Sequence, residues 1–280
     1  MKIQTLLKES NEQLIYYSKT SKLDVEILLS EAIKKNREYL IINCKKKVKN
    51  KNIKLFKKML NKRKKGEPIA YILNKKEFWR NNFYVDKNVL IPRPDTEVLV
   101  EEVLKLFNIN LKLNVLDIGT GSGCILLSIL NERKNFYGTG IDISKKAIKV
   151  AIFNAKMHQL SNRVDFYHSD VDKFLFGKYD LIVSNPPYIK DIEILSLDKD
   201  VKLNEPKLAL SGGKSGLNKV FKVIKKSQKL LKTKGKLILE VGDKQSKEVK
   251  EYLTKNNFNQ IQVFRDLSRK DRCIVSTKAN

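Results

Sequence analysis

The sequence has little of the chemistry that builds metal centres and nucleophilic triads. It contains only two histidines, His158 and His168, and three cysteines, Cys44, Cys124 and Cys273, which lie far apart in the chain. This spacing matches neither a disulfide framework nor a zinc site. We therefore expect no bound metal, and we expect both histidines and Cys124 to have structural roles.

Long apolar runs are missing as well. No segment approaches the ~18 apolar residues of a membrane span. The start, MKIQTLLKESNEQ, has polar residues where a signal peptide would be apolar. We expect a soluble, cytoplasmic protein without a membrane partner. The 280 residues, 41% of them hydrophobic, suffice for one large domain or for a small and a larger one.

Arginine is scarce, although the formal net charge is +26. The chain has 9 arginines and 48 lysines, and the lysines are spread along its whole length. A charge of this size can indicate a nucleic-acid partner. However, Lys, Asn and Ile all have A/T-rich codons, so compositional drift explains the charge at least as well. We do not expect a dedicated nucleic-acid surface, and we expect a monomer.

The first ~70 residues have helical periodicity. One apolar stripe comprises Val25, Leu28, Leu29, Ala32 and Ile33. We predict a helical domain over residues 1–65, which would recognise a substrate. Residues 66–94 contain aromatic and β-branched residues between prolines and asparagines, which indicates a β-hairpin linker. The third region, residues 95–280, starts with a helix for which Asp95 or Thr96 is a candidate N-cap.

Strands and helices alternate from Leu113 onward, which is typical of a doubly wound, mostly parallel α/β sheet. The last two strands are joined by a short loop and should pair antiparallel. The predicted strands span residues 113–118, 136–141, 163–168, 179–183, 236–241, 259–264 and 272–276.

A glycine-rich loop follows the first of these strands. In VLDIGTGSGC, residues 115–124, the strand ends at Asp117, and three glycines precede a helix. Glycines permit tight turns and close approach of a ligand, and a helix N-terminus offers free N–H groups. Asp142 ends the next strand, where a carboxylate can accept hydrogen bonds from two ribose hydroxyls. Dinucleotide binding and a purely structural turn are the alternatives at this point.

Two further strand ends are candidates for the same crevice. In HSDV, residues 168–171, Asp170 or the backbone of Val171 could meet an adenine edge, or Asp170 could be a loop carboxylate without a role. In SNPPYI, residues 184–189, two prolines make the chain stiff and short of N–H donors. The Asn185 oxygen and the Pro186 carbonyl could accept both N–H groups of a planar amine or amide. Tyr188 could stack on it.

These motifs together resemble the class I S-adenosylmethionine-dependent methyltransferases that act on a planar nitrogen. Over residues 66–275, the resemblance is to the protein-(glutamine-N5) methyltransferases of peptide-chain release factors. It is carried by DIGTGSG and NPPY together with GEPIAYI, EFW, LIPRPDTE, NEPKLAL, GGKSGL, LILEVG and DLSRKDR.

The resemblance implies a substrate, a cofactor and a set of site residues. The acceptor would be the glutamine of a release factor's Gly-Gly-Gln loop, and S-adenosylmethionine would be the methyl donor. The catalytic residues would be Asn185, Pro186 and Tyr188, and the substrate-binding residues Asn185, Pro186, Pro187 and Tyr188. The cofactor-binding residues would be Gly119, Thr120, Gly121, Ser122, Gly123, Asp142, Val171 and Asn185. Members of the family often have an aromatic residue where this chain has Val171, so stacking on adenine is lost.

Two rival functions are open at this point. An adenine-N6 DNA methyltransferase would use the same NPPY motif on a flipped base, but the sequence has no evident target-recognition domain. A nucleotide-binding module without catalysis would have no use for the NPPY acceptors. The sequence therefore favours a methyltransferase of protein glutamine.

Overall fold

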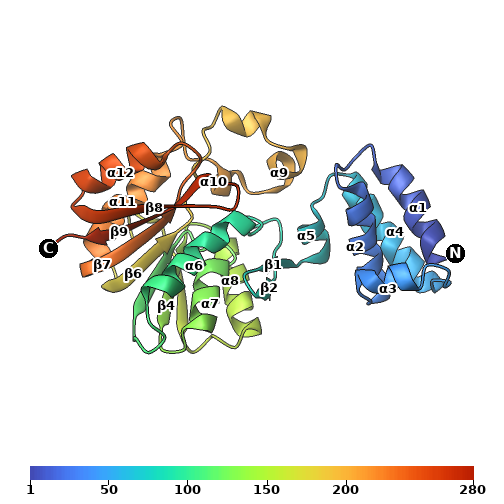
Figure 1. The fold of residues 1–280 in the computed structure, drawn as a ribbon, viewed down its shortest axis with the longest axis horizontal. Helices are drawn as coiled ribbons and strands as arrows, with labels where there is room; N and C mark the ends of the chain where they lie inside the picture. Colours follow the sequence, from blue (N-terminus) through green and yellow to red (C-terminus); the bar gives the residue numbers. More distant parts are fainter. The chain divides into compact units, whose positions relative to one another are not determined.

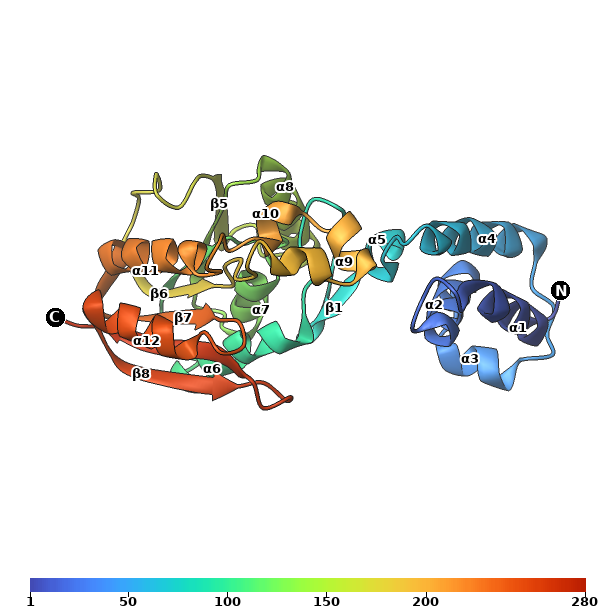
Figure 2. The ribbon, with the colours of Figure 1, turned by 90° about the horizontal axis from the view of Figure 1, so that it is seen from above.

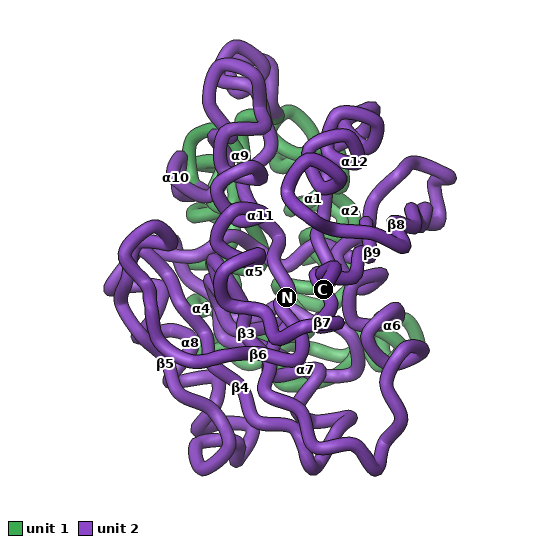
Figure 3. The backbone as a smooth tube through the Cα atoms, turned by 90° about the vertical axis from the view of Figure 1, so that its left-hand side faces the viewer, with its two compact units in different colours: residues 1–74, 198–204 green, residues 75–197, 205–280 purple.

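Separate hydrophobic cores divide the chain into two units (Figure 3). The computed structural model describes all of residues 1–280. Unit 1 comprises Met1–Asn74 and Asp198–Asn204, and unit 2 comprises Lys75–Leu197 and Glu205–Asn280. The helical domain predicted for residues 1–65 falls within unit 1, which also takes in a segment from far along the chain.

Unit 1 is helical because its apolar residues recur at helical spacing. The predicted stripe is buried at Val25, Leu28, Leu29 and Ala32, where it packs against Phe56 and residues of the other helices. The helices of unit 1 are α1 (Ile3–Leu14), α2 (Ser21–Ile33), α3 (Arg37–Ile42), α4 (Asn50–Lys64), α5 (Ile69–Leu73) and, from the second segment, α9 (Lys199–Asn204).

Residues 66–94 contain both a helix and a hairpin. Helix α5 belongs to unit 1, and the antiparallel pair β1 (Lys76–Phe78) and β2 (Asn81–Phe83) belongs to unit 2. Phe78 and Phe83 are fully buried and join one of the two cores of unit 2. This packing anchors the hairpin to the larger unit.

Unit 2 is built on a seven-stranded sheet with the order β5-β4-β3-β6-β7-β9-β8 (Figure 1). Neighbouring strands from β5 to β7 are parallel, whereas β9 is antiparallel to both β7 and β8. The predicted mostly parallel sheet with a final antiparallel strand is therefore confirmed. The strands are β3 (Asn114–Ile118), β4 (Tyr137–Asp142), β5 (Val164–His168), β6 (Tyr179–Ser184), β7 (Leu231–Glu240), β8 (Phe258–Arg265) and β9 (Asp271–Lys278).

Helices cover both faces of the sheet because each central strand is apolar on both sides. On β3, Val115 packs with one core and Leu116 with the other. The first core includes residues of α6 (Glu97–Leu106), α7 (Cys124–Glu132) and α8 (Lys145–Met157), and the second includes residues of α11 (Asn218–Leu230) and α12 (Ser246–Lys255). Figures 1 and 2 show α11 and α12 lying together beside the β7–β9 end of the sheet.

The strand order fixes the place of the site. From β3 the chain continues to β4 and β5 on one side, and it later returns to β6 and β7 on the other. The carboxyl ends of β3 and β6 therefore flank a topological switch point, the usual ligand crevice of an open α/β sheet. Both the glycine-rich loop and the NPPY segment begin at these strand ends.

Candidate active site

A cavity of about 220 Å³ lies at the carboxyl ends of the parallel strands. It is lined from one strand end after another by residues within 118–122, 141–144, 169–171 and 184–187. Residues of the LIPRP segment and of the chain after Glu205 close the remaining wall. Four motifs that are far apart in the sequence thus meet around one space.

The glycine-rich loop turns sharply at the end of β3. Gly119, Gly121 and Gly123 have φ angles of 76°, 55° and 80°, which only glycine adopts without strain. The backbone N–H groups of Gly119 and Thr120 both donate to the Ile141 carbonyl, which ties the loop to β4. Gly119, Thr120, Gly121 and Ser122 line the cavity, whereas Gly123 does not and instead caps α7.

Asp117 supports this loop from beneath. Its side chain is fully buried and accepts a hydrogen bond from the Thr120 hydroxyl at 2.7 Å. Burial raises the Asp117 pKa to about 7, against the opposing effect of the Thr120 bond. Cys124 follows the loop and is buried, and burial raises the pKa of its thiol to about 12. Cys124 also lines the cavity, where its thiol stays protonated at neutral pH.

Asp142 lines the cavity at the end of β4. Its two carboxylate oxygens accept the backbone N–H groups of Gly121, at 2.9 Å, and Ser144, at 2.8 Å. Burial raises its pKa, while these two N–H groups lower it. Each oxygen keeps a further lone pair, so the carboxylate can still accept hydrogen bonds from a ligand.

The HSDV segment forms the neighbouring wall. Ser169, Asp170 and Val171 line the cavity beyond Asp142. Val171 is half-buried and packs against the core on the α11 side of the sheet. His168 is tied to the Ile143 backbone carbonyl at 3.0 Å, and His158 to that of Asn82 at 3.1 Å, as expected for structural histidines.

The NPPY segment forms a further wall of the cavity. Asn185, Pro186 and Pro187 line it, and the Asn185 side-chain NH₂ donates to the Thr96 hydroxyl at 3.1 Å. Tyr188 does not line the cavity, because its ring packs into the core and its hydroxyl donates to Glu240 Oε1 at 3.0 Å. Burial raises the Tyr188 pKa, so its hydroxyl stays protonated.

The GGKSGL loop needs its glycines because it packs closely against the NPPY segment. The Gly212 N–H donates to the Ile189 carbonyl at 2.8 Å, and a Cβ at Gly212 would lie 2.8 Å from the Pro187 carbonyl oxygen. At Gly216, a Cβ would lie 2.6 Å from the Tyr188 carbonyl oxygen. Only glycine lets the loop approach closely enough to hold the two prolines in place.

Several side chains that shape the site had no role assigned from sequence. Glu205 accepts hydrogen bonds from Arg93 at 2.6 Å and from the Ile91 N–H at 3.2 Å, which joins the LIPRP and NEP segments. Asn154 is fully buried and donates to the Ser122 carbonyl at 2.8 Å, behind the glycine-rich loop. The sequence signal that could have indicated Glu205, Arg93 and Asn154 is a charged or amide residue next to apolar ones.

Thr96 takes the N-cap position of α6, as predicted, but its side chain makes no capping hydrogen bond. A short 3₁₀ turn, Pro94–Thr96, precedes the helix, and the Thr96 hydroxyl is used by Asn185 instead. The N-cap position was therefore predicted correctly, but the capping hydrogen bond is absent, because Thr96 itself has helical φ and ψ angles of −69° and −18° as the last residue of the 3₁₀ turn.

Comparison with known proteins identifies the family. The family model described as a methyltransferase domain matches residues 109–274, and that of the PrmC N-terminal domain matches residues 5–73. The chain is 40% identical over 278 residues to the release factor glutamine methyltransferase of Buchnera aphidicola subsp. Baizongia pistaciae, covering 99% of this chain and 100% of that one. The chain belongs to the release factor glutamine methyltransferase family.

Other relatives agree with this assignment. The release factor glutamine methyltransferase of Clostridium acetobutylicum is 39% identical over 281 residues, which cover 99% of this chain and 96% of that one. A solved methyltransferase from Pyrococcus furiosus matches with a TM-score of 0.53 at 20% identity, over 71% of this chain and 89% of that chain. The likeness to this solved structure supports only the class I methyltransferase fold. This release factor glutamine methyltransferase family member is an S-adenosylmethionine-dependent methyltransferase.

The cavity fits the cofactor that the family uses. The positive φ angles of the glycine-rich loop bring backbone close to the cavity, and Asp142 offers acceptor oxygens one strand away. The polar strand ends are accompanied by the apolar side chains of Ile143 and Val171, against which a purine ring can lie.

None of the helices is long and apolar enough to cross a membrane, and no group of three or more metal-ligating side chains is present.

Proposed function

We propose that this methyltransferase transfers a methyl group from S-adenosylmethionine to the side-chain amide nitrogen of the glutamine in the Gly-Gly-Gln loop of peptide-chain release factors. One observation carries the proposal. The Asn185 NH₂ group is engaged by Thr96, so its oxygen is free for a ligand in the same wall as the Pro186 and Pro187 backbone. The names of the relatives support a release-factor substrate, which would place the reaction in the cytoplasm.

The acceptors of the NPPY segment suit a primary amide. Such an amide has two N–H donors in one plane, and the Asn185 oxygen and the Pro186 carbonyl would accept one each. Neither proline has an N–H group that could compete for these acceptors. Pro187 would set the shape of the pocket, and Tyr188 would support it from the core side.

The cofactor would lie across the other strand ends. Gly119, Thr120, Gly121 and Ser122 would surround its amino-acid portion, and Gly123 would hold the helix that follows. Asp142 would accept hydrogen bonds from the ribose hydroxyls. Val171 would provide apolar contact for adenine without aromatic stacking. In this position, the bound cofactor supplies an electrophilic methyl group on a sulfonium.

Catalysis would then be a matter of alignment. An amide nitrogen is a poor nucleophile, and no strong base lies among the residues of the NPPY segment. Holding both N–H groups points the nitrogen at the methyl carbon, which converts the encounter into an oriented reaction. The N–C bond would form as the C–S bond breaks, the electron pair of the C–S bond would remain on sulfur in S-adenosylhomocysteine, and one amide proton would be released to water. The two acceptors stabilise the positive charge that develops on nitrogen.

The test compares three acceptors with one labelled methyl donor. We expect transfer to intact release factor, and none to the same factor with glutamate in place of the loop glutamine, which has no amide nitrogen. Duplex DNA is the third acceptor, because the adenine-N6 reaction would use the same motif. Labelling of the DNA, or equal labelling of the glutamate variant, would contradict the proposal.

A further inference from the structure

The segment that follows β5 forms one wall of the cavity without belonging to a helix or a strand. Residues 169–171 line the cavity, and the next regular element, β6, begins only at Tyr179. Within the segment, the backbone N–H groups of Lys173 and Phe174 donate to the Asp170 carbonyl. These bonds close a local turn and leave the later carbonyl groups of the segment to find donors elsewhere.

Lys226 on α11 supplies these donors. Its ammonium group donates to the backbone carbonyls of Asp172 and Phe174, at 2.9 Å each. No backbone N–H group donates to either oxygen, so the lysine side chain is what ties this part of the backbone to α11. Only 6% of Lys226 is exposed, although lysine is almost never fully buried unless its charge has partners.

A second lysine of α11 holds the same segment from outside. Lys222 lies one turn before Lys226, on the same side of the helix, and pairs with the Asp172 carboxylate. About half of each of these two side chains is exposed, and such a pair contributes little. The two carbonyl bonds of the buried Lys226 are therefore the main attachment of the segment to α11.

This attachment fixes the surroundings of Asp170. One carboxylate oxygen of Asp170, Oδ1, accepts the backbone N–H of Asp172 at 2.8 Å, and Lys226 holds the carbonyl of that same residue. Asp170 lines the cavity, and its carboxylate has further lone pairs for a ligand. A shift of the backbone at Asp172 would therefore move this acceptor.

We propose that Lys226 is a positioning residue for the cofactor, which holds the backbone after Val171 and so fixes Asp170 as the acceptor for the amino group of adenine. Val171 offers the base apolar contact but no aromatic face, so recognition of the base depends on how firmly this wall is held. The inference rests on the proposed position of the cofactor, and it adds a residue that does not touch the cofactor.

The decisive variant is Lys226→Met, which keeps a side chain of similar length but has no N–H donor. The Kd for S-adenosylmethionine and for S-adenosylhomocysteine should rise roughly tenfold, which corresponds to the loss of one hydrogen bond to adenine. We expect kcat at saturating cofactor and KM for intact release factor to stay within about twofold of wild type. Asn185 and Pro186 would orient the substrate amide without help from this wall.

Base selectivity separates positioning from a general loosening of the protein. S-inosylhomocysteine carries an oxygen where adenine has its amino group, so it offers Asp170 no N–H at that place. Wild type should bind S-adenosylhomocysteine roughly tenfold more tightly than this analogue, and Lys226→Met should lose most of the preference. A merely structural Lys226 would weaken both ligands equally and leave their ratio unchanged.

Two matched variants serve as controls. Lys278→Met removes another lysine that donates to a backbone carbonyl, that of Leu231 at 2.9 Å, at the opposite edge of the sheet from the cavity. Asp172→Asn breaks the ion pair with Lys222 but keeps the carbonyl that Lys226 holds. Both controls should bind both ligands within about twofold of wild type. Equal losses in Asp172→Asn and Lys226→Met would show that the exposed ion pair, and not Lys226, holds the segment.

Amide hydrogen exchange tests the wall in the wild-type protein. Binding of S-adenosylhomocysteine should slow exchange within residues 170–175 and leave residues 275–280, at the end of β9, unchanged. In the ligand-free Lys226→Met variant, residues 170–175 should exchange faster than in wild type, because the turn loses its attachment to α11. An absence of protection by the ligand would mean that this segment is not a wall of the cofactor site, and the proposal would fail.

The binding measurements need no methyl acceptor, so their outcome is separate from that of the proposed function. Wild-type affinity and base selectivity in Lys226→Met would overturn the positioning role. So would a large fall of its thermal midpoint together with equal losses for both ligands. A wild-type enzyme that binds S-adenosylmethionine but transfers no methyl group to release factor would instead contradict the proposed function alone.

Discussion

Asn185 shows how a single side chain depends on residues that the sequence does not place near it. Its acceptor role was predicted from the NPPY spacing alone, but its orientation depends on Thr96, 89 residues earlier in the chain. The sequence marks Thr96 as a helix cap, because local capping is the commonest use of threonine at such a position. The Thr96 hydroxyl instead accepts from Asn185, a tertiary partner that no local pattern reveals.

Replacing Asn185 by alanine should abolish most methyl transfer. The variant removes one of two acceptors that orient the substrate nitrogen, and such a loss costs roughly 10²–10³ in kcat. The measurement is single-turnover transfer to intact release factor, with S-adenosylmethionine affinity measured in parallel. Asn162→Ala, at an exposed turn, serves as the control. Wild-type turnover by the Asn185 variant would refute its proposed role.

Asp142→Ala should weaken cofactor binding more than it slows the reaction of bound cofactor. Loss of hydrogen bonds from a carboxylate to ribose costs about 1.5–3 kcal/mol. The change also frees the N–H groups of Gly121 and Ser144, so Asp142→Asn is a useful milder comparison. Calorimetric titration with S-adenosylmethionine gives the affinity. An unchanged affinity in the alanine variant would exclude the ribose contact.

At the scale of elements, central strands such as β3 and β6 could be predicted because each is a short, mostly apolar run between polar turns. The order of the strands could not be read from the chain, since it depends on pairing between strands such as β3 and β6, which lie more than 60 residues apart. Helix α9 also escaped the sequence analysis. It is short, it has no buried residue, and it belongs to unit 1 through tertiary contacts.

The contact between α4 and α9 centres on a buried arginine. Arg63 donates to Asp24 at 2.7 Å and to Asp200 at 2.6 Å, and its side chain is 6% exposed. A basic run such as KRKK, residues 62–65, usually forms a solvated face. Arg63 is nevertheless buried, because two carboxylates of unit 1 compensate its charge.

Arg63→Met should therefore strongly destabilise unit 1. Removing one partner of a buried ion pair leaves the other uncompensated and costs about 3–5 kcal/mol. The matched control is Arg37→Met, which breaks the pair with Glu26 at a half-exposed position and should cost about 0–1 kcal/mol. Denaturant unfolding of both variants measures the difference. Equal midpoints for the two variants would contradict this account of Arg63.

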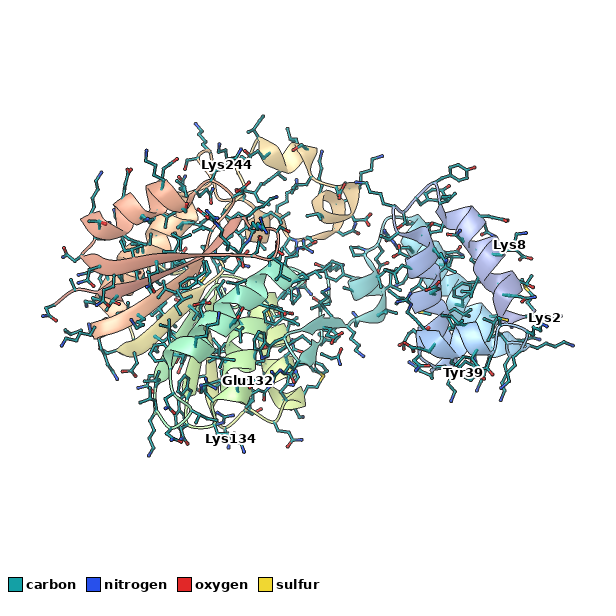
Figure 4. The ribbon with its side chains drawn as sticks, in the orientation of Figure 1. Lys2, Lys8, Tyr39, Glu132, Lys134 and Lys244 are labelled. Atoms are coloured by element: carbon teal, nitrogen blue, oxygen red, sulfur yellow. The ribbon has the colours of Figure 1, made fainter.

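At the scale of the whole molecule, we propose that recognition and methyl transfer belong to different units. The cavity residues all belong to unit 2, and one exposed glutamine side chain offers little surface for selection. A standard protein interface covers about 800 Å² on each partner. We therefore propose that unit 1 recognises the release factor. Lys8 on α1 and Lys2, which directly precedes this helix, are exposed there, as Lys134 is in unit 2 (Figure 4).

Salt should then affect intact release factor more than a short Gly-Gly-Gln peptide. Attraction between the lysine-rich enzyme and an acidic partner is screened as the Debye length shrinks from about 10 Å at 0.1 M salt to about 3 Å at 1 M. We expect kcat/KM to fall with salt for the intact factor and to change little for the peptide. Lys8→Glu should lower kcat/KM for the intact factor, whereas Lys134→Glu should not. Equal effects on both substrates would argue against recognition by unit 1.

The second segment of unit 1 has a consequence for the order in which the protein can be completed during synthesis. Asp200 leaves the ribosome 137 residues after Arg63, when β3 to β6 of unit 2 have already been made. At about 5–20 residues per second, roughly 7–30 s pass between the synthesis of Arg63 and that of Asp200. During this time Asp24 is the only carboxylate partner of Arg63 in the first segment. Synthesis of unit 1 thus begins first and ends only after four of the seven strands of the sheet have been made. A nascent chain halted before residue 198 should therefore expose the surface that α9 later covers.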